Sequence, residues 1–315
     1  MIKRFLTAAI AALACLSAQA RTDINFLWPY SPSHGATPVF FAVIEEANKL
    51  QNKYNFVFES KPGADGLIAI QHMNVQPATR VTVIAPGFVD LSMQGKINEQ
   101  DYKHLVGFGD MCFAVWMKNA DPVKGFESIK DQKEIVIGNV GWGNGSHLIA
   151  LSIAEKYNMN VRNIVFKSNR EGLVNLAQGG GVTLVVDKLD AFNDLRERAS
   201  VQANPAAVTC SQRVKAWPNT KTLAEQGIMA RAPWLILSAN KDMPKDTQQD
   251  ITDIINRAIV AVGPDKVMEL SNLHPVVFMK NKNVDDFYKE RSTLQKSLLK
   301  KYQATIDADR GTTNK

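Results

Sequence analysis

The sequence predicts an α/β protein of two lobes with a ligand cleft between them. Strand-like and helix-like segments alternate along the chain, which indicates parallel strands in an α/β sheet. The pattern stops and starts again at Cys112, so a second α/β unit follows the first. Glycine-rich loops follow several of the strands, and ligands of open α/β sheets bind at the carboxyl ends of the strands. Two such units facing each other would form a cleft.

The first twenty residues have the pattern of a secretory signal. Lys3 and Arg4 precede an apolar run over residues 5–16, and Ala18-Gln19-Ala20 offers small residues for a signal peptidase. We expect cleavage after Ala20, with a lipoprotein cut before Cys15 as the alternative. No later apolar run has the roughly 20 residues that cross a bilayer. The expected mature chain of 295 residues is longer than one core usually organises, so two lobes are expected.

The first unit contains three segments with strand character and two with helical character. Apolar residues at steps of three and four indicate helices after the loop at residues 29–35 and after the loop at residues 62–66. The expected strands cover residues 24–28, 56–59 and 81–85, and the expected helices cover residues 40–50 and 67–73.

The second unit repeats this alternation and is followed by closing helices. Its expected strands cover residues 113–117, 135–138, 164–166, 182–186 and 207–210, with one more at 234–238. Its expected helices cover residues 126–130, 146–157, 171–178 and 222–226. The closing helices are expected at residues 247–262, 265–272 and 284–302, and the polar tail at 303–315 is expected to fray.

Composition narrows the class of partner. Loss of the signal lowers the formal charge from +6 to +4, which suits anionic solutes but lacks the clustered basic surface of nucleic-acid binders. Cys112 and Cys210 remain in the mature chain, either as a disulfide or as two buried thiols. The five histidines are scattered, so we expect neither a metal nor another cofactor.

Enzyme motifs are missing from the sequence. The glycine loop at residues 141–145 lacks the third glycine of a dinucleotide fingerprint at its proper step, and no acidic residue ends the next strand. There is no Gly-x-Ser-x-Gly elbow and no His-Glu-x-x-His pair. We therefore expect a binding protein, not an enzyme.

Four segments in order resemble the solute receptors of tripartite tricarboxylate transporters, the Bug receptors. Residues 29–37 resemble the first binding loop of that family, and residues 60–66 resemble its Asn-Arg-Pro-Gly-Ala-Gly-Gly. Residues 141–148 are similar to Gly-x-Gly-Ser/Thr-x-x-His-Leu, and residues 217–227 to Leu-Pro-x-x-Pro-Thr-Leu-x-Glu-x-Gly. The similarity spans nearly all of the expected mature chain.

The resemblance implies a type II periplasmic binding protein fold. Lobe 1 would combine residues 21–111 with 233–315, and lobe 2 would hold residues 112–232. The implied function is capture of a small carboxylate (an organic acid) in the periplasm and delivery to the permease subunits of a tripartite transporter, with the receptor a monomer. A receptor that feeds a membrane sensor kinase is the alternative.

The candidate site residues lie on loops after strands. Glycines at 141, 143 and 145 let backbone amides and a helix start face an anion; a plain turn with a helix cap is the alternative. The alternative to ligand contact is a helix cap for Asp65 and packing between the lobes for Trp142. His147 is expected to have a structural role. The expected ligand-binding residues are Tyr30, Ser31, Ser33, His34, Gly35, Ala64, Asp65, Gly87, Trp142, Gly143, Asn144, Gly145, Ser146, Lys167 and Asp187.

Several ligand-facing positions depart from the family pattern. Pro38 stands where an Asp is frequent, Ala42 where an Arg is usual, and Asn144 where Ser or Thr is common. Because position 38 carries no carboxylate, the ammonium group of an amino-acid ligand would lack its partner. A buried charge without a partner costs several kcal/mol. We expect an acid without an α-amino group, although Asp187 could supply the missing charge.

Overall fold

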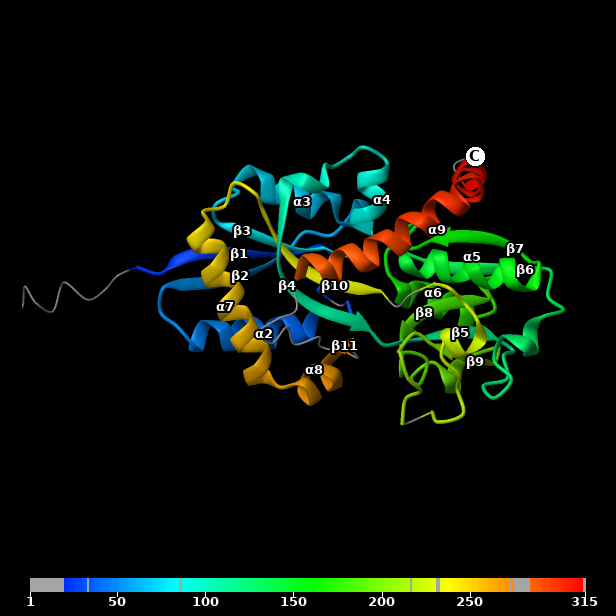
Figure 1. Cartoon of the computed structure of the whole chain (residues 1–315). Coiled ribbons are helices and arrows are strands. Elements are labelled where there is room, and N and C mark those ends of the chain that lie inside the picture. The colour runs from blue at the N-terminus through cyan, green and yellow to red at the C-terminus, as the bar shows by residue number, and fades with distance from the viewer. Residues whose placement is uncertain are drawn as a thin grey trace, which may run out of the picture.

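The computed structural model describes residues 20–32, 34–84, 87–215, 217–230, 233–271, 273–274 and 284–313. The described chain forms two lobes, each built on a mixed β-sheet with helices packed against it (Figure 1). We call lobe 1 the six-stranded sheet with its helices and lobe 2 the five-stranded sheet with its helices. The predicted α/β fold with two lobes is confirmed.

The sheet of lobe 1 has the order β11-β4-β10-β3-β1-β2. Parallel pairing joins β1 to β2 and to β3, as the alternation of strands and helices predicts, and β10 runs antiparallel between β3 and β4. The central strands are buried on both faces, which is why they read as continuous apolar runs. The strands are β1 (Thr22–Trp28), β2 (Tyr54–Ser60), β3 (Arg80–Ile84), β4 (Tyr102–Met111), β10 (Trp234–Asn240) and β11 (Leu273–His274).

Helices cover both faces of this sheet (Figure 1). The helix α7 packs on α2 through Ile251, Ile254 and Ile255, whose spacing places them on one side of the helix. One face carries α2 (Thr37–Lys49), α7 (Lys245–Val262) and α8 (Pro264–Ser271), and the other carries α3 (Leu67–Val75) and α4 (Gly87–Met93). Short 3-10 helices lie at Ala64–Gly66 and Glu99–Asp101.

The sheet of lobe 2 has the order β7-β6-β8-β5-β9. Here β6 is parallel to β7 and β8, and β5 is antiparallel to β8 and β9. The strands are β5 (Phe113–Lys118), β6 (Glu134–Asn139), β7 (Asn160–Val165), β8 (Leu184–Lys188) and β9 (Ala203–Val208), and the helices are α5 (Gly145–Tyr157) and α6 (Asn169–Ala177). Short 3-10 helices lie at Phe126–Ile129, Arg196–Arg198 and Ala224–Gln226.

The chain passes from one sheet to the other at Cys112, between β4 and β5, and returns between β9 and β10. Cys112 and Cys210 form a disulfide with their Cα atoms 4.6 Å apart, which decides between the two states that the sequence left open. Beside it, the Thr209 hydroxyl donates to the carbonyl of Met111 and accepts from the amide of Phe113, both at 2.8 Å. The first crossing is therefore fastened to the end of β9.

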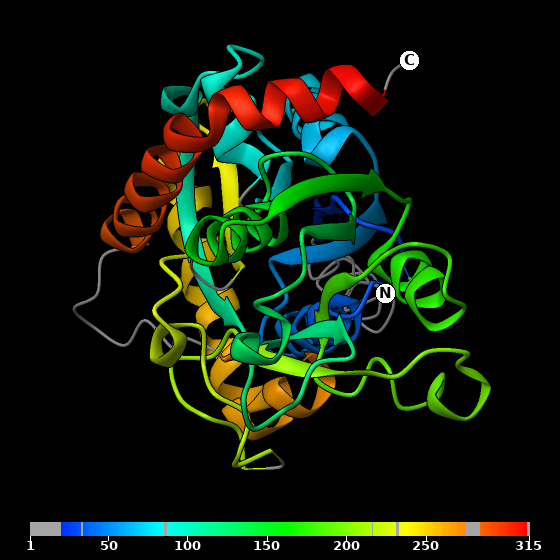
Figure 2. The same ribbon diagram turned by 90° about the vertical axis from the view of Figure 1, so that its right-hand side faces the viewer.

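The C-terminal helix α9 (Val284–Thr313) joins the lobes from outside. It packs on β4 and α4 of lobe 1 and on α5 and β7 of lobe 2, and Figures 1 and 2 show it along the outside of the molecule. In lobe 2, Lys301 pairs with Glu155 at 2.6 Å, and the Asp309 carboxylate accepts from the amide of Asn163 at 3.1 Å. In lobe 1, Arg310 pairs with Asp90 at 3.2 Å.

Two of the differences from the sequence-based expectation have a clear physical cause. The prediction of a frayed tail was wrong for residues 303–313, because Ile306 is buried and the charged residues Asp309 and Arg310 find partners in both lobes. The strand β4 was not predicted, because Gly107 and Gly109 break its strand pattern. In the structure, these glycines lie at register shifts against β10, where an irregular backbone is needed.

Among the described helices, none combines the length and the apolarity that a bilayer span requires.

Candidate functional site

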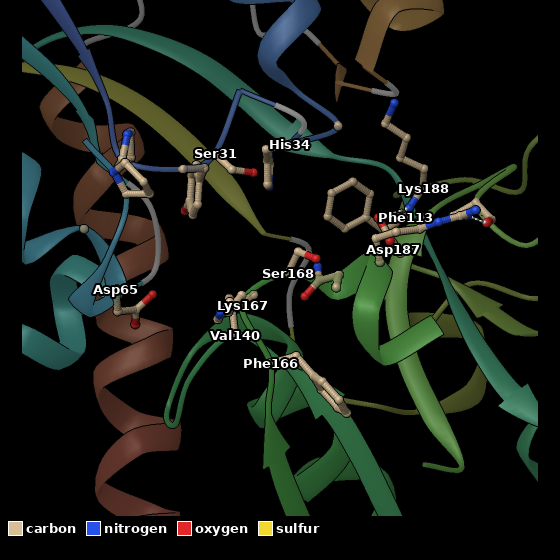
Figure 3. A pocket seen from close by; sticks show the side chains of 18 of the residues that line it. Ser31, His34, Asp65, Phe113, Val140, Phe166, Lys167, Ser168, Asp187 and Lys188 are labelled. Carbon is tan, nitrogen blue, oxygen red and sulfur yellow. Dashed lines mark hydrogen bonds between the residues drawn. The ribbon is translucent and has the colours of Figure 1, made fainter. Parts of the chain in front are cut away.

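A cavity of about 850 Å³ lies between the lobes. Its walls come from the loops that follow β1 and β2 in lobe 1 and from the carboxyl ends of β6, β7 and β8 in lobe 2 (Figure 3). Phe113, the first residue of β5, completes the wall. This is the position that the topology of α/β sheets predicts for a ligand.

The loop after β1 supplies four of the predicted residues, Tyr30, Ser31, His34 and Gly35. The rings of Tyr30 and His34 stack with centroids 4.4 Å apart, and Nδ1 of His34 accepts from the amide of Ala36 at 3.2 Å. Burial, and then the nearby Lys188, lower the pKa of His34 to about 4, so its imidazole is neutral at physiological pH. Ser33, also predicted, lies outside the described residues.

The loop after β2 has an uncommon backbone. Gly63, Ala64, Asp65 and Gly66 follow one another with φ values of 124°, 48°, 54° and 94°. Ala64 and Asp65, both predicted site residues, therefore occupy the left-handed region that side chains normally avoid. This conformation brings the Asp65 carboxyl group into the pocket wall. Strained backbone of this kind is concentrated at functional sites.

Burial, and then the Asp90 carboxylate, raise the pKa of Asp65 to about 7. Burial raises the pKa of the neighbouring Tyr30 hydroxyl well above its usual range, with Asp65 as the second cause. Gly87, another predicted residue, does not line the pocket but accommodates Asp65: a Cβ at position 87 would lie 2.4 Å from the Asp65 Cγ.

Lobe 2 contributes the N-terminus of α6 and the segment before it. Lys167, a predicted residue, lines the pocket between Phe166 and Ser168. The Ser168 hydroxyl accepts from the amide of Glu171 at 3.3 Å, and the Glu171 carboxylate accepts from the amide of Lys167 at 3.1 Å. These bonds fix the first turn of α6 at the cavity.

The end of β8 places Asp187 and Lys188 at the pocket. Asp187 was predicted; its Oδ1 accepts from the amide of Lys188 at 2.8 Å, and burial raises its pKa to about 6. Lys188 was not predicted, because the strand was expected to end two residues earlier. Its side chain crosses to lobe 1, where a Cβ at Gly35 would lie 2.1 Å from the Lys188 Cε.

The glycine loop after β6 takes a different position from the one expected. Val140 lines the pocket, whereas Trp142, Gly143, Asn144, Gly145 and Ser146 do not. The amide of Gly141 donates to Oδ1 of Asn139 at 2.8 Å, and the amide of Gly143 donates to Nδ1 of His147 at 3.1 Å. Both amides are thus used within the protein, which is the physical reason for the difference.

The remaining side chains of this loop support the fold. Asn144 caps α5 by accepting from the amide of His147 at 3.0 Å, and Trp142 lies beside α9 with the Arg310 guanidinium 6.0 Å from its ring centroid. Burial lowers the pKa of His147 to about 4, in keeping with the structural role expected for it. A role for this loop in ligand binding stays a prediction.

Several lining residues escaped sequence reasoning, among them Phe113, Val140, Phe166, Ser168 and Lys188. A signal exists for four of them, because Phe113 begins a strand, Lys188 ends one, and Val140 and Phe166 directly follow one, whereas Ser168 is the N-cap of α6. Within the described ranges, no group of three His, Cys, Asp or Glu side chains could hold a metal ion.

A family model described as the tripartite tricarboxylate transporter family receptor, TctC, matches residues 41–303. The chain belongs to this receptor family. The family is one of binding proteins and not of enzymes. A comparison with curated proteins gives no match.

Solved structures show the same fold. The periplasmic binding protein BugD aligns with a TM-score of 0.73 at 19% identity over 91% of this chain and 99% of its own. An adipate-bound protein of R. palustris aligns with a TM-score of 0.70 at 19% identity over 90% and 97%. Malate-bound MatC of Rhodopseudomonas palustris aligns with a TM-score of 0.70 at 16% identity over 89% and 99%. The receptor therefore has the type II fold of periplasmic binding proteins.

Proposed function

We propose that this receptor captures a small carboxylate in the periplasm and delivers it to the permease subunits of a tripartite transporter. The observation that carries the proposal is a pair of lysines on the lobe 2 side of the cavity that have no ion-pair partner among the described residues. Lys167 and Lys188 both line the cavity there, and in the part of the chain that the structure describes neither ammonium group forms an ion pair with a carboxylate within 4 Å. A ligand carboxylate would supply the missing counter-charge.

The N-terminus of α6 adds to this attraction. The helix begins at Asn169 and lines the cavity with its first residues. A helix N-terminus carries partial positive charge and presents free backbone N–H groups, which favour an anion. Carboxylate binding therefore rests on two independent sources of positive potential.

The relatives support the chemical class. The two R. palustris structures hold adipate and malate, which are both dicarboxylates. With identities of 19% and 16%, they support a carboxylate for this receptor without indicating which one.

Export and delivery complete the proposal. The signal at residues 1–20 would be removed after Ala20, and the mature receptor would work as a monomer without cofactor. Residues 21–111 with 233–315 would form one closing unit and residues 112–232 the other. Closure on the ligand would present a different surface to the permease than the open form does.

Calorimetry on residues 21–315 tests ligand capture. We expect at least one of succinate, malate and adipate to bind, and the matching diamides, which lack charge, to remain inactive. Lys167→Met and Lys188→Met should each weaken binding about ten-fold or more, whereas Lys133→Met, which changes an exposed lysine outside the cavity, should leave it unchanged. Binding of the diamides as tightly as the acids would contradict the proposal.

Measurements of uptake in whole cells test whether the receptor delivers its ligand to the permease. A strain lacking the receptor should lose uptake of the bound acid, and the parent chain should restore it. Normal uptake together with a lost transcriptional response to the acid would indicate a sensing receptor instead.

A further inference from the structure

The carboxyl group of Asp65 faces the cavity from lobe 1 and has no ion-pair partner among the described residues. It lines the pocket on the side away from Asp187 and Lys188 (Figure 3). In the part of the chain that the structure describes, no side chain or amide donates a hydrogen bond to it. Asp65 is half-buried, and a carboxylate partly withdrawn from water without a partner loses solvation, so a cationic group of a ligand would be stabilised on this side.

Neighbouring charges do not supply the partner. Arg310 is the cation with the larger charge effect on Asp65, but it pairs with Asp90 at 3.2 Å. Asp90 also accepts from Nε2 of Gln94 at 2.5 Å, and Lys96 acts on both carboxylates only through its charge. The strongest charge effect on Asp65 comes from Asp90 and is repulsive.

Of the other acidic groups that line the cavity, Asp187 and Asp194 are already engaged, and Asp190 is exposed to solvent. Oδ1 of Asp187 accepts from the amide of Lys188, and the positive charges of Lys188 and Arg170 act on it. Asp194 pairs with Arg170. Asp65 differs from both in having a second carboxylate, Asp90, as its main charged neighbour.

The geometry points to Asp65 as a specificity-determining residue that binds a protonated amino group of the ligand. The receptor would then select a small acid with carboxylate and ammonium groups, with the carboxylate towards Lys167 and Lys188. This inference rests on the proposed function. It replaces the expectation from Pro38, because a carboxylate missing from the loop after β1 is supplied by the loop after β2.

A protonated Asp65 that donates to a ligand carboxylate is the competing arrangement. It would bring a ligand carboxylate close to the ionised Asp90, whose negative charge disfavours it. The two arrangements predict opposite pH dependences. Ammonium binding needs ionised Asp65 and strengthens as the pH rises, whereas binding through a protonated Asp65 weakens.

Matched ligand pairs provide the test: succinate with aspartate, glutarate with glutamate, and adipate with 2-aminoadipate. Calorimetry on residues 21–315 should show, in at least one pair, the amino compound binding ten-fold or more tighter than the plain acid at pH 8. The same advantage should shrink at pH 5.5, where Asp65 is protonated.

Asp65→Gly is the decisive variant, because glycine adopts a φ of 54° without strain, so that the fold is kept. It should abolish the advantage of the amino compound and leave binding of the plain acid unchanged or stronger. Asp194→Asn, a change at a cavity residue that already has a partner, should retain the advantage.

The outcomes separate the two proposals. Plain acids binding more tightly than their amino counterparts, or more tightly at pH 5.5 than at pH 8, would overturn the role of Asp65 and leave carboxylate capture standing. Absence of binding by every acid in the panel would refute carboxylate capture, and this inference with it.

Discussion

The backbone N–H of Gly143 donates a hydrogen bond to Nδ1 of His147 over 3.1 Å. The imidazole of His147, on the first turn of α5, thus accepts the hydrogen bond from the Gly143 amide that we expected a ligand to accept. Gly143 has a φ of 70°, and a Cβ there would lie 2.9 Å from both Oδ1 of Asp90 and Cδ2 of Leu299. The glycine loop of lobe 2 is therefore pressed against α4 and α9.

We predict that Gly143→Ala destabilises the fold by about 2–4 kcal/mol, from left-handed strain plus the two close contacts. Urea unfolding measures the loss. Gly95→Ala is the matched control, because Gly95 has a φ of 69° and open space around its Cα; strain alone should cost it about 1 kcal/mol. Equal losses in the two variants would show that the contact with α4 and α9 contributes nothing.

Arg310→Met should lower the free energy of unfolding by about 2 kcal/mol, because the largely buried carboxylate of Asp90 would lose its ion-pair partner. Arg213→Met breaks an exposed pair with Glu225 and should cost less than about 1 kcal/mol. Denaturant unfolding of both variants provides the comparison. A loss for Arg310→Met no larger than for Arg213→Met would mean that α9 does not depend on this pair.

The stability effect of Asp65→Asn should depend on pH. The pKa of Asp65 is about 7 in the fold against an ordinary 3.8, so between these values the native state keeps a proton that the unfolded chain has lost. The contribution of Asp65 to stability is therefore complete below pH 3.8 and is lost as the pH rises to about 7.

Asparagine does not ionise, so the ligand-free variant should be more stable than the parent at pH 8 by roughly 1–2 kcal/mol, after a discount for solvent screening. At pH 4.5 this gain should nearly disappear. Thermal unfolding at the two pH values measures it, and a gain that is independent of pH would argue against a raised pKa at Asp65.

Reduction of the disulfide should destabilise the receptor. Cys112 and Cys210 are 98 residues apart in the sequence, and a link of that span removes much freedom from the unfolded chain, worth about 2–5 kcal/mol. We expect a lower melting temperature in reductant and in the double variant Cys112→Ala, Cys210→Ala. Reductant should not affect the double variant; a further decrease there would point to a different cause.

Gly35→Ala should affect binding more than folding. The new Cβ would meet the flexible end of Lys188, which can move at little cost, and Gly35 does not have a positive φ. The ammonium of Lys188 would be displaced, so we expect affinity for the carboxylate to fall several-fold while the melting temperature changes by no more than a few degrees. Calorimetry and thermal unfolding on one preparation separate the two effects, and unchanged affinity would remove Lys188 from the site.

Local pattern determined much of the fold. Apolar runs such as Phe26-Leu27-Trp28 predicted strands, and spacings such as Ile251, Ile254 and Ile255 predicted helices, because burial of one face imposes its period on the sequence. Local pattern did not predict β4, because Gly107 and Gly109 fit a register that only pairing with β10 defines. It also missed the last turns of α9, whose Asp309 and Arg310 are paired only after both lobes have formed.

The sequence by itself determined the α/β class, the family and the loops after the strands from which the pocket is built. Only the tertiary structure decided which loop residues face the cavity. Tyr30, Asp65, Lys167 and Lys188 come together through sheet pairing across the whole chain, and the Gly143 amide turns inward because His147 lies beside it. Secondary structure follows from neighbours in sequence. A side chain's charge balance and hydrogen-bond partners follow from neighbours in space, and these determine what the site can bind.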